Sequence, residues 1–300
     1  MSEPSEEIAN AMPAVPSQEN PQPDPNYNFY LKMKPLRTLR RAIEALLDPT
    51  FKDDHGFGIV GVTNESLVIS ATNKDKNTTA ALFLKSPGMI EFRNNAPPPP
   101  LLSVELWAPL DLISQGLPCN LDGDDDTVII SHVHGTNRLC FEFGTVPPTG
   151  YWVQIVEIHN ATLFPYLMVL TATTVPVNDI REMIDCTLQT RDLVKIDWKP
   201  DFASFEIGSD NKWEYDYSQN EVREPTRLKN GDIYQAEFDW VYTSLMKKVC
   251  LLSDKVGVLF LAVPEQHVLF KFHMGEIADF KLIKKAVLEV RDMNTQAGDA

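Results

Sequence analysis

The amino-acid sequence predicts an α+β fold in which two duplicated units, each built of antiparallel sheets and two helices, follow one another along the chain. Three observations predict it. Both halves run in the order strand, helix, several strands, helix and further strands. Two similar strands, 138–143 (RLCFEF) and 267–272 (HVLFKF), hold equivalent places before the last strand of each half. A chain of 300 residues has room for two such units.

The first unit opens with a strand over 28–34 (NFYLKMK), whose apolar residues recur at every second position. Pro35 then suits the first turn of a helix over 36–47. The apolar stripe of that helix consists of Leu36, Leu39, Ile43 and Leu46. The other elements expected in this half are strands at 57–62, 66–72, 79–86 and 101–106, a helix at 108–117, and strands at 127–134, 138–143 and 151–158.

The second half repeats this order. Its expected elements are a strand at 166–172, a helix at 177–188, strands at 193–198, 203–207, 212–218 and 232–238, a helix at 239–252, and strands at 256–263, 267–272 and 284–290. The segment 1–26 is rich in Pro, Glu, Ser and Asn, so we expect it to be a disordered tail. A second loose tail is expected at 294–300.

The composition limits the class of protein. A formal net charge of −15 argues against general attraction to nucleic acid or anionic membranes, although it leaves room for a local basic patch. No apolar run approaches the length of a membrane span. The cysteines are scattered and form no CxxC pair, which indicates reduced thiols in a cytosolic or nuclear protein: Cys119, Cys140, Cys186 and Cys250.

Enzymatic motifs are absent from the sequence, which has no P-loop and no GxGxxG, HExxH or GxSxG pattern. His132 and His134 share one strand face, which permits two metal ligands, but no third ligand lies near them in sequence. The acidic run 122–126 (DGDDD) is expected to be a turn and not a cation site, since it lacks the EF-hand spacing. A two-metal nuclease built on Asp124, Asp125 and Asp126 is the alternative from a different functional class. We therefore expect no catalysis, no metal and no cofactor.

A basic segment stands out in this acidic chain. Arg37, Arg40 and Arg41 project from nearly the opposite side of the helix 36–47 to its apolar stripe. Arg40 and Arg41 also precede Glu44 by about one helical turn, a spacing at which ion pairs form on a solvated face. The pattern by itself leaves both interpretations open, a phosphate-binding face and a self-paired one.

Three segments carry a resemblance. Segment 35–49 (PLRTLRRAIEALLDP) looks like a clamp's first inner helix, where a basic pair precedes a Leu/Val-Glu-Ala-Leu run. Segment 57–86 is similar to the three strands that follow that helix. Segment 256–283 is similar to a closing hairpin in which Met-Gly precedes the last strand. Over residues 27–293 the chain thus resembles the eukaryotic sliding clamp PCNA, a DNA polymerase processivity factor, in a divergent form that also suits a viral clamp.

The resemblance implies clamp domains at 27–156 and 166–293, joined by an interdomain connector at 157–165. It implies that three copies close into a homotrimeric ring, with helices lining a hole around double-stranded DNA and sheets outside. Such a ring has no active site. It tethers a DNA polymerase and other clamp-binding proteins in DNA replication and DNA repair, and a clamp loader places it on DNA. The implied location is the nucleus or a viral replication compartment, with no membrane partner.

In that layout four helices face the DNA. Their basic residues are the candidate DNA-binding residues: Arg37, Arg40, Arg41, Arg181, Lys247 and Lys248. The same helices carry five acidic residues: Glu44, Asp111, Asp179, Glu182 and Asp185. Six against five leaves a surplus of one positive charge, so we expect weak and strongly salt-dependent DNA binding by the unloaded protein.

The other candidate residues concern protein contacts. Leu163, Phe164 and Pro165 are apolar residues of the connector, where the resemblance implies a partner-binding groove, and they equally fit a cap on the core. Ring closure in the family pairs two edge strands, here 151–158 and 212–218 by position. The candidate subunit-interface residues, for which an intramolecular cover is the alternative, are Tyr151, Val153, Trp213 and Tyr215.

Two alternative functions with the same fold remain open. One is a subunit of a heterotrimeric checkpoint clamp, which shares the fold. The other is a monomeric or dimeric viral processivity factor, which holds DNA by charge instead of by closure. The mass of the protein in solution separates these from the homotrimer.

Overall fold

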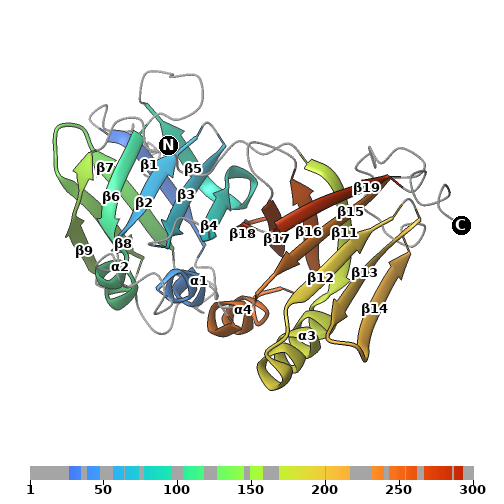
Figure 1. The fold of residues 1–300 in the computed structure, drawn as a ribbon. Coiled ribbons are helices and arrows are strands. Elements are labelled where there is room, and N and C mark those ends of the chain that lie inside the picture. Colours follow the sequence, from blue (N-terminus) through green and yellow to red (C-terminus); the bar gives the residue numbers. More distant parts are fainter. Residues whose placement is uncertain are drawn as a thin grey trace, which may run out of the picture.

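The computed structural model describes residues 27–34, 39–47, 57–63, 65–73, 78–95, 104–117, 127–144, 149–157, 169–199, 201–216, 232–239, 243–253, 255–261, 267–285 and 287–292. Within them the strands form three sheets in which all pairs are antiparallel (Figure 1). This confirms the predicted α+β class.

Each sheet has its own order of neighbouring strands. The first runs through β5 (Met89–Asn94), β1 (Tyr27–Met33), β7 (Val128–Val133), β8 (Arg138–Phe143) and β9 (Thr149–Gln154). The central one runs through β10 (Val156–Glu157), β6 (Val104–Pro109), β2 (Phe57–Val62), β3 (Ser66–Thr72), β4 (Thr78–Lys85), β18 (Ala278–Lys285), β17 (His267–Met274), β16 (Lys255–Leu261) and β11 (Val169–Pro176). The third runs through β14 (Asn211–Asp216), β13 (Phe202–Ile207), β12 (Val194–Trp198), β15 (Asp232–Phe238) and β19 (Val287–Asp292).

The α-helices lie in a row along one side of the sheets (Figure 1). In this row α1 (Leu39–Leu46) contacts α2 (Leu110–Gly116) and α4 (Thr243–Val249), and α4 contacts α3 (Val177–Thr190). A short 3-10 helix, η2 (Ser86–Gly88), follows β4. Leu39, Ile43 and Leu46 of the stripe predicted for α1 are buried, and Leu36 lies outside the described residues. In α3 the apolar residues at helical spacing are buried as well: Ile180, Met183 and Ile184.

The predicted duplication is present in the sheet topology. The strands β1-β7-β8-β9 of the first half are neighbours in the same order as β11-β16-β17-β18 of the second half. Likewise, β4-β3-β2-β6 corresponds to β14-β13-β12-β15. Each half also contributes two helices at matching places in this order. The fold therefore consists of two copies of one unit, and the domain limits 27–156 and 166–293 stay a prediction.

One strand pair joins the two units. β18 lies antiparallel to β4, with Phe280 opposite Leu82 and Lys281 opposite Ala81. This pairing, which we call the joint, makes the central sheet continuous from one unit to the other. The strands that correspond to β18 and β4 in the other copies of the unit are β9 and β14. Both are the last strands of their sheets within the described residues.

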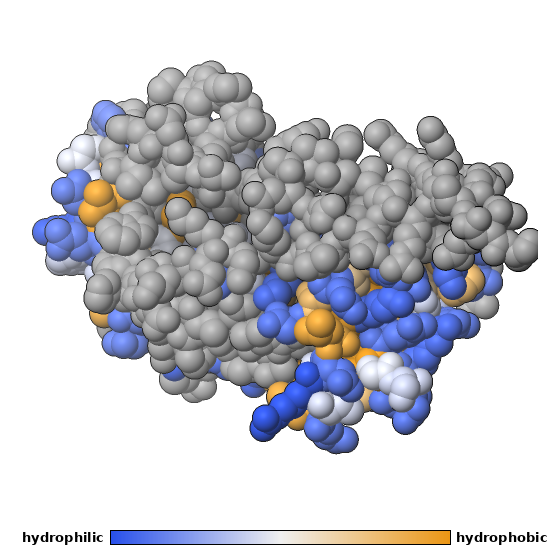
Figure 2. Space-filling view, viewed as in Figure 1, coloured by the Kyte–Doolittle hydropathy of each residue, from blue (hydrophilic) through white to orange (hydrophobic). Residues whose placement is uncertain are grey.

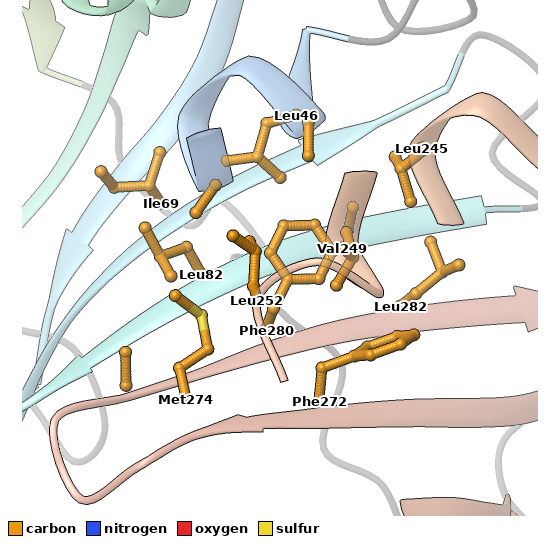
Figure 3. Packing of buried hydrophobic residues seen from close by; sticks show 14 of the residues in the cluster. Leu46, Ile69, Leu82, Leu245, Val249, Leu252, Phe272, Met274, Phe280 and Leu282 are labelled. Carbon is orange, nitrogen blue, oxygen red and sulfur yellow. The ribbon is translucent and has the colours of Figure 1, made fainter. Parts of the chain in front are cut away.

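The core also crosses the joint. Figure 3 shows side chains from β4, β17 and β18 meeting side chains from α1 and α4 beneath the joint. Phe272, Phe280 and Leu46 are fully buried there. Because the apolar surface of both units is removed from water in one cluster, hydrophobic burial holds the two units together in addition to the strand pairing.

The structure corrects two predicted strands and adds one that was not predicted. The single strand expected at 151–158 is divided, since the chain leaves β8 after Gln154 and β10 pairs with β6 instead. The strand expected at 284–290 is the end of β18 and the start of β19, which pairs with β15. β5 was not predicted, and it forms by pairing with β1. Among the described residues, no helix has the length and apolar character needed to span a membrane.

Candidate functional site

The basic residues of α1 differ in their surroundings. Arg40 donates from Nε to Oε1 of Glu44 at 2.8 Å and from Nη1 to the backbone oxygen of Leu117 at 3.4 Å. Glu44 therefore balances its charge, and its guanidinium ties α1 to the residue that follows α2. Arg41 is exposed. Arg37 lies outside the described residues.

The basic candidates of α3 and α4 also include two residues, Arg181 and Lys247, that form contacts within the chain. Nζ of Lys247 lies 2.6 Å from Oδ1 of Asp185, which links α4 to α3. Arg181 donates from Nη2 to the backbone oxygen of Cys250 at 2.7 Å, just beyond the end of α4. Lys248 is exposed. The row of helices is thus fixed partly by the residues that were expected to face DNA.

The helix face is close to neutral. Within the described helices the basic residues are Arg40, Arg41, Arg181, Lys247 and Lys248, and the acidic residues are Glu44, Asp111, Asp179, Glu182 and Asp185. Arg41 and Lys248 are exposed, and neither forms an ion pair within the part of the chain that the structure describes. Figure 2 shows that much of the described surface of the second unit is hydrophilic. Any phosphate attraction on the described helix face therefore depends mainly on these two cations.

The candidate interface residues of β9 point into their own unit. Tyr151 stacks on Phe141 with ring centroids 4.9 Å apart, and its hydroxyl donates to the backbone oxygen of Ile113 at 3.0 Å. Burial raises the pKa of Tyr151 well above its ordinary value of 10.0. Val153 is only 3% exposed. The part of β9 that is available to another chain is therefore its backbone edge and the side chains of the opposite face.

The candidates of β14 have the same orientation. The Tyr215 hydroxyl donates to Oδ2 of Asp179 on α3 at 2.7 Å, and its ring meets Phe205 edge-on. Burial, and then the hydrogen bond to Asp179, raise the pKa of Tyr215. Trp213 is half-buried against the core. On the other face of β14, Lys212 and Glu214 are exposed, and Nζ of Lys212 lies 2.9 Å from Oε1 of Glu214.

Sequence reasoning did not single out Trp152. This large aromatic residue is 52% exposed and lies on β9, the last strand of its sheet within the described residues. The guanidinium carbon of Arg138 lies 4.2 Å from the centre of its ring. The signal was available, because neighbouring residues of a strand face opposite sides: if Tyr151 and Val153 point inward, Trp152 points outward. An exposed aromatic residue at a sheet edge is a typical interface anchor.

The two histidines considered as metal ligands serve a hydrogen-bond chain. His134 Nδ1 lies 3.0 Å from Oδ1 of Asn28, and the Asn28 amide donates to His132 Nδ1 at 3.1 Å. His132 Nε2 then donates to the backbone oxygen of Thr136 at 2.9 Å. Both ring nitrogens of His132, which is fully buried, are used in this way. The described residues contain no group of side chains suited to a metal ion, and residues 124–126 lie outside them.

The described cysteines are reduced thiols. Cys140, Cys186 and Cys250 form no disulfide, and Cys119 lies outside the described residues. Burial raises the pKa of Cys250 to about 11, so its thiol stays protonated at neutral pH.

The connector residues Leu163, Phe164 and Pro165 also lie outside the described residues. The partner-binding role expected for them stays a prediction.

Comparison with known proteins identifies the fold. The chain is similar to the crystal structure of the proliferating cellular nuclear antigen from Entamoeba histolytica, with a TM-score of 0.62 and 13% identity. The match covers 87% of this chain and 99% of that chain. No protein-family model and no curated protein sequence matches the chain. The chain therefore has a PCNA-like clamp fold in a strongly divergent sequence.

Proposed function

We propose that the chain is one subunit of a sliding clamp, a ring that encircles duplex DNA and tethers a DNA polymerase and other partners without catalysing a reaction. The observation that carries this proposal is the joint. β18 of one unit pairs with β4 of the other, whereas the corresponding strands β9 and β14 end their sheets within the described residues. The pairing that joins two units inside the chain is thus available a second time, between chains.

Pairing of β9 with β14 between chains adds subunits one after another. β9 and β14 belong to different units, so their pairing is heterologous and leaves each new subunit with one edge to offer. A heterologous contact closes into a ring when the rotation between subunits allows it. The PCNA-like fold favours closure with three subunits. Closure also covers both strand edges, which otherwise invite uncontrolled association.

The helix row supports the position of DNA inside such a ring. All four α-helices of the described residues lie on one side of the sheets, and they include Arg41 and Lys248 as exposed cations. A nearly neutral face suits a topological tether, because retention on DNA then comes from closure while weak phosphate contacts permit sliding. The proposed site of action is the nucleus or a viral replication compartment, where polymerases and a clamp loader are the partners.

The mass of the full-length protein tests assembly. Light scattering after size-exclusion chromatography is expected to give three times 33.8 kDa for the homotrimer. A single mass of 33.8 kDa at every concentration up to about 100 μM, well above the Kd of a stable oligomer, contradicts the homotrimer. It favours a subunit of a heterotrimeric clamp or a monomeric processivity factor.

A further inference from the structure

The two helix pairs of the chain share one contact. Arg40 of α1 donates to the backbone oxygen of Leu117, the residue after α2, and Arg181 of α3 donates to that of Cys250, the residue after α4. The amides of Leu117 and Cys250 each close a last helical turn, by donating to the backbone oxygen of the residue four positions earlier. Leu117 therefore corresponds to Cys250, and α2 corresponds residue by residue to α4.

The first helices of the two units correspond in the same way. Arg40 matches Arg181, and the residues three positions later, Ile43 and Ile184, are both fully buried. Five positions after each arginine the chain has Ala45 in α1 and Cys186 in α3. Five residues turn an α-helix by about 140°, so these two side chains lie on the side away from α2 and α4 respectively.

The contact of α1 with α4 shows how helices of different units pack across the joint. Lys247 bonds to Asp185 of α3, so Leu245, two residues earlier and about 200° around α4, lies on the side away from α3. Figure 3 shows Leu245 in the cluster beneath the joint, together with Leu46 of α1. Leu245 and Ala45 are both fully buried. These two helix positions are therefore covered where one unit meets another inside the chain.

The same two positions are open at the ends of the helix row, where α2 and α3 stand (Figure 1). Leu112 lies five residues before Leu117 and is the counterpart of Leu245, yet it is 47% exposed. Cys186, the counterpart of the fully buried Ala45, is only half-buried. Both lie beside the strands β9 and β14, which end their sheets within the described residues.

The surface next to Leu112 continues onto β9. Gly116 of α2 corresponds to Val249 of α4, which is fully buried. A Cβ on Gly116 would lie 2.3 Å from the Tyr151 ring, so this ring fills the space that a side chain at Gly116 would take. Because Tyr151 belongs to β9, an apolar surface extends from Leu112 to the strand edge that the proposed ring uses.

We propose that Leu112 of one chain packs against the Cys186 side of α3 in a second copy, so that a helix contact between chains lies beneath the pairing of β9 with β14. A second copy is the occupant because the chain contains the same contact once already, between α4 and α1. The inference rests on the proposed function, since it requires β9 to pair with β14, and it adds buried side chains to a pairing of backbone edges.

Cross-linking of the full-length protein with a short bismaleimide tests this contact. The test variant is Leu112→Cys, which keeps the native Cys186. Denaturing gels are expected to show covalent species of two and three chains. Leu112→Cys with Cys186→Ser is expected to remain a single chain on the gel, although the other cysteines are present. Leu251→Cys is the matched control, because Leu251 is a 63% exposed leucine directly after α4, and it is expected to remain a single chain as well.

Assembly constants give a second readout. Leu112→Asp places a carboxylate in the proposed contact and is expected to weaken assembly at least about tenfold in Kd, while Leu251→Asp stays within about twofold. Mass photometry over a dilution series measures both. If wild type is a trimer but the cross-link does not need Cys186, or Leu112→Asp assembles like wild type, the helix contact is wrong and the ring stands. A single-chain mass of wild type at every concentration contradicts the proposed function itself.

Discussion

Nζ of Lys247 lies 2.6 Å from Oδ1 of Asp185, so an ion pair joins α4 to α3 on the face that we propose for DNA. Both side chains are about half exposed, with fractions of 47% and 58%. An exposed pair contributes little to stability, so its main effect is on the electrostatic potential of the face. Asp185 therefore offsets the charge of Lys247, one of the few cations on this face that a phosphate could contact.

Replacing Asp185 by Asn is therefore expected to strengthen DNA binding. Lys247 then becomes available to a phosphate, which raises the affinity for a short duplex by about threefold at 50 mM salt and steepens its salt dependence by about one counterion. Fluorescence anisotropy with labelled duplex measures both quantities. Asp210→Asn is the control, because Asp210 is an exposed acid in the turn before β14 and is not part of a helix. Equal effects of both variants contradict the assignment.

The double variant Arg41→Glu with Lys248→Glu is expected to weaken the same binding by at least about tenfold, because it reverses the two exposed cations of the helix face. Polymerase stimulation falls with it. The triple change of Arg37, Arg40 and Arg41 to Glu extends this test to the whole basic segment. Lys199→Glu, directly after β12 of the third sheet, serves as the control. Full polymerase stimulation by the double and triple variants shows that another face contacts DNA.

Trp152→Ala is expected to weaken assembly by about tenfold in Kd, because an exposed aromatic at the edge of β9 is buried when β14 of another chain pairs there. Ile90→Ala is the matched control. Ile90 is 55% exposed on β5, at the opposite edge of the same sheet. Mass photometry over a dilution series measures both constants. If the two variants dissociate alike, β9 is not the assembling edge.

Stability is expected to fall steeply above pH 10. The pKa values of Tyr151 and Tyr215 are raised in the folded protein, so the unfolded chain releases these protons near the ordinary value of 10.0 while the folded chain retains them. The unfolded state then binds fewer protons, and the free energy of unfolding decreases as the pH rises. This contribution is fully present below pH 10.

The variant Tyr151→Phe with Tyr215→Phe tests this dependence in urea titrations. At pH 7 it is expected to lose about 1 kcal/mol for each missing hydroxyl hydrogen bond. Between pH 10 and about 11.5 its stability declines less than that of wild type, because it lacks both titrating hydroxyls. Parallel declines in wild type and variant indicate that other groups control the alkaline transition.

Local patterns predicted much of the fold. The apolar stripes of α1 and α3 are visible in the sequence, because apolar residues recur at helical spacing within each helix. Ile43 in α1 and Ile180 in α3 belong to these stripes, and both are fully buried. The repeated order of elements predicted the duplication. β5 was missed because its residues have no alternating pattern of full burial; it exists through its pairing with β1. The division of the strand 151–158 also depends on a distant partner, β6.

The candidate site was predictable to a smaller extent. The pair of Arg40 and Glu44 follows from a spacing of four residues on one helix, which the sequence shows directly. The pair of Lys247 and Asp185 joins helices that are far apart in sequence, so only the packing of α3 beside α4 reveals it. The ion pair between Lys85 of β4 and Asp279 of β18 likewise requires the joint between these two strands.

Topological retention tests the central claim, that the protein encircles DNA. A linear duplex is attached to a bead at one end, the protein is added at the free end, and that end is then closed with a streptavidin cap. In about 1 M salt, where charge contacts are screened within a few ångströms, the ring is expected to stay on the capped DNA and to leave when a restriction enzyme cuts the duplex. Loss of the protein in high salt from capped and uncapped DNA alike contradicts encirclement.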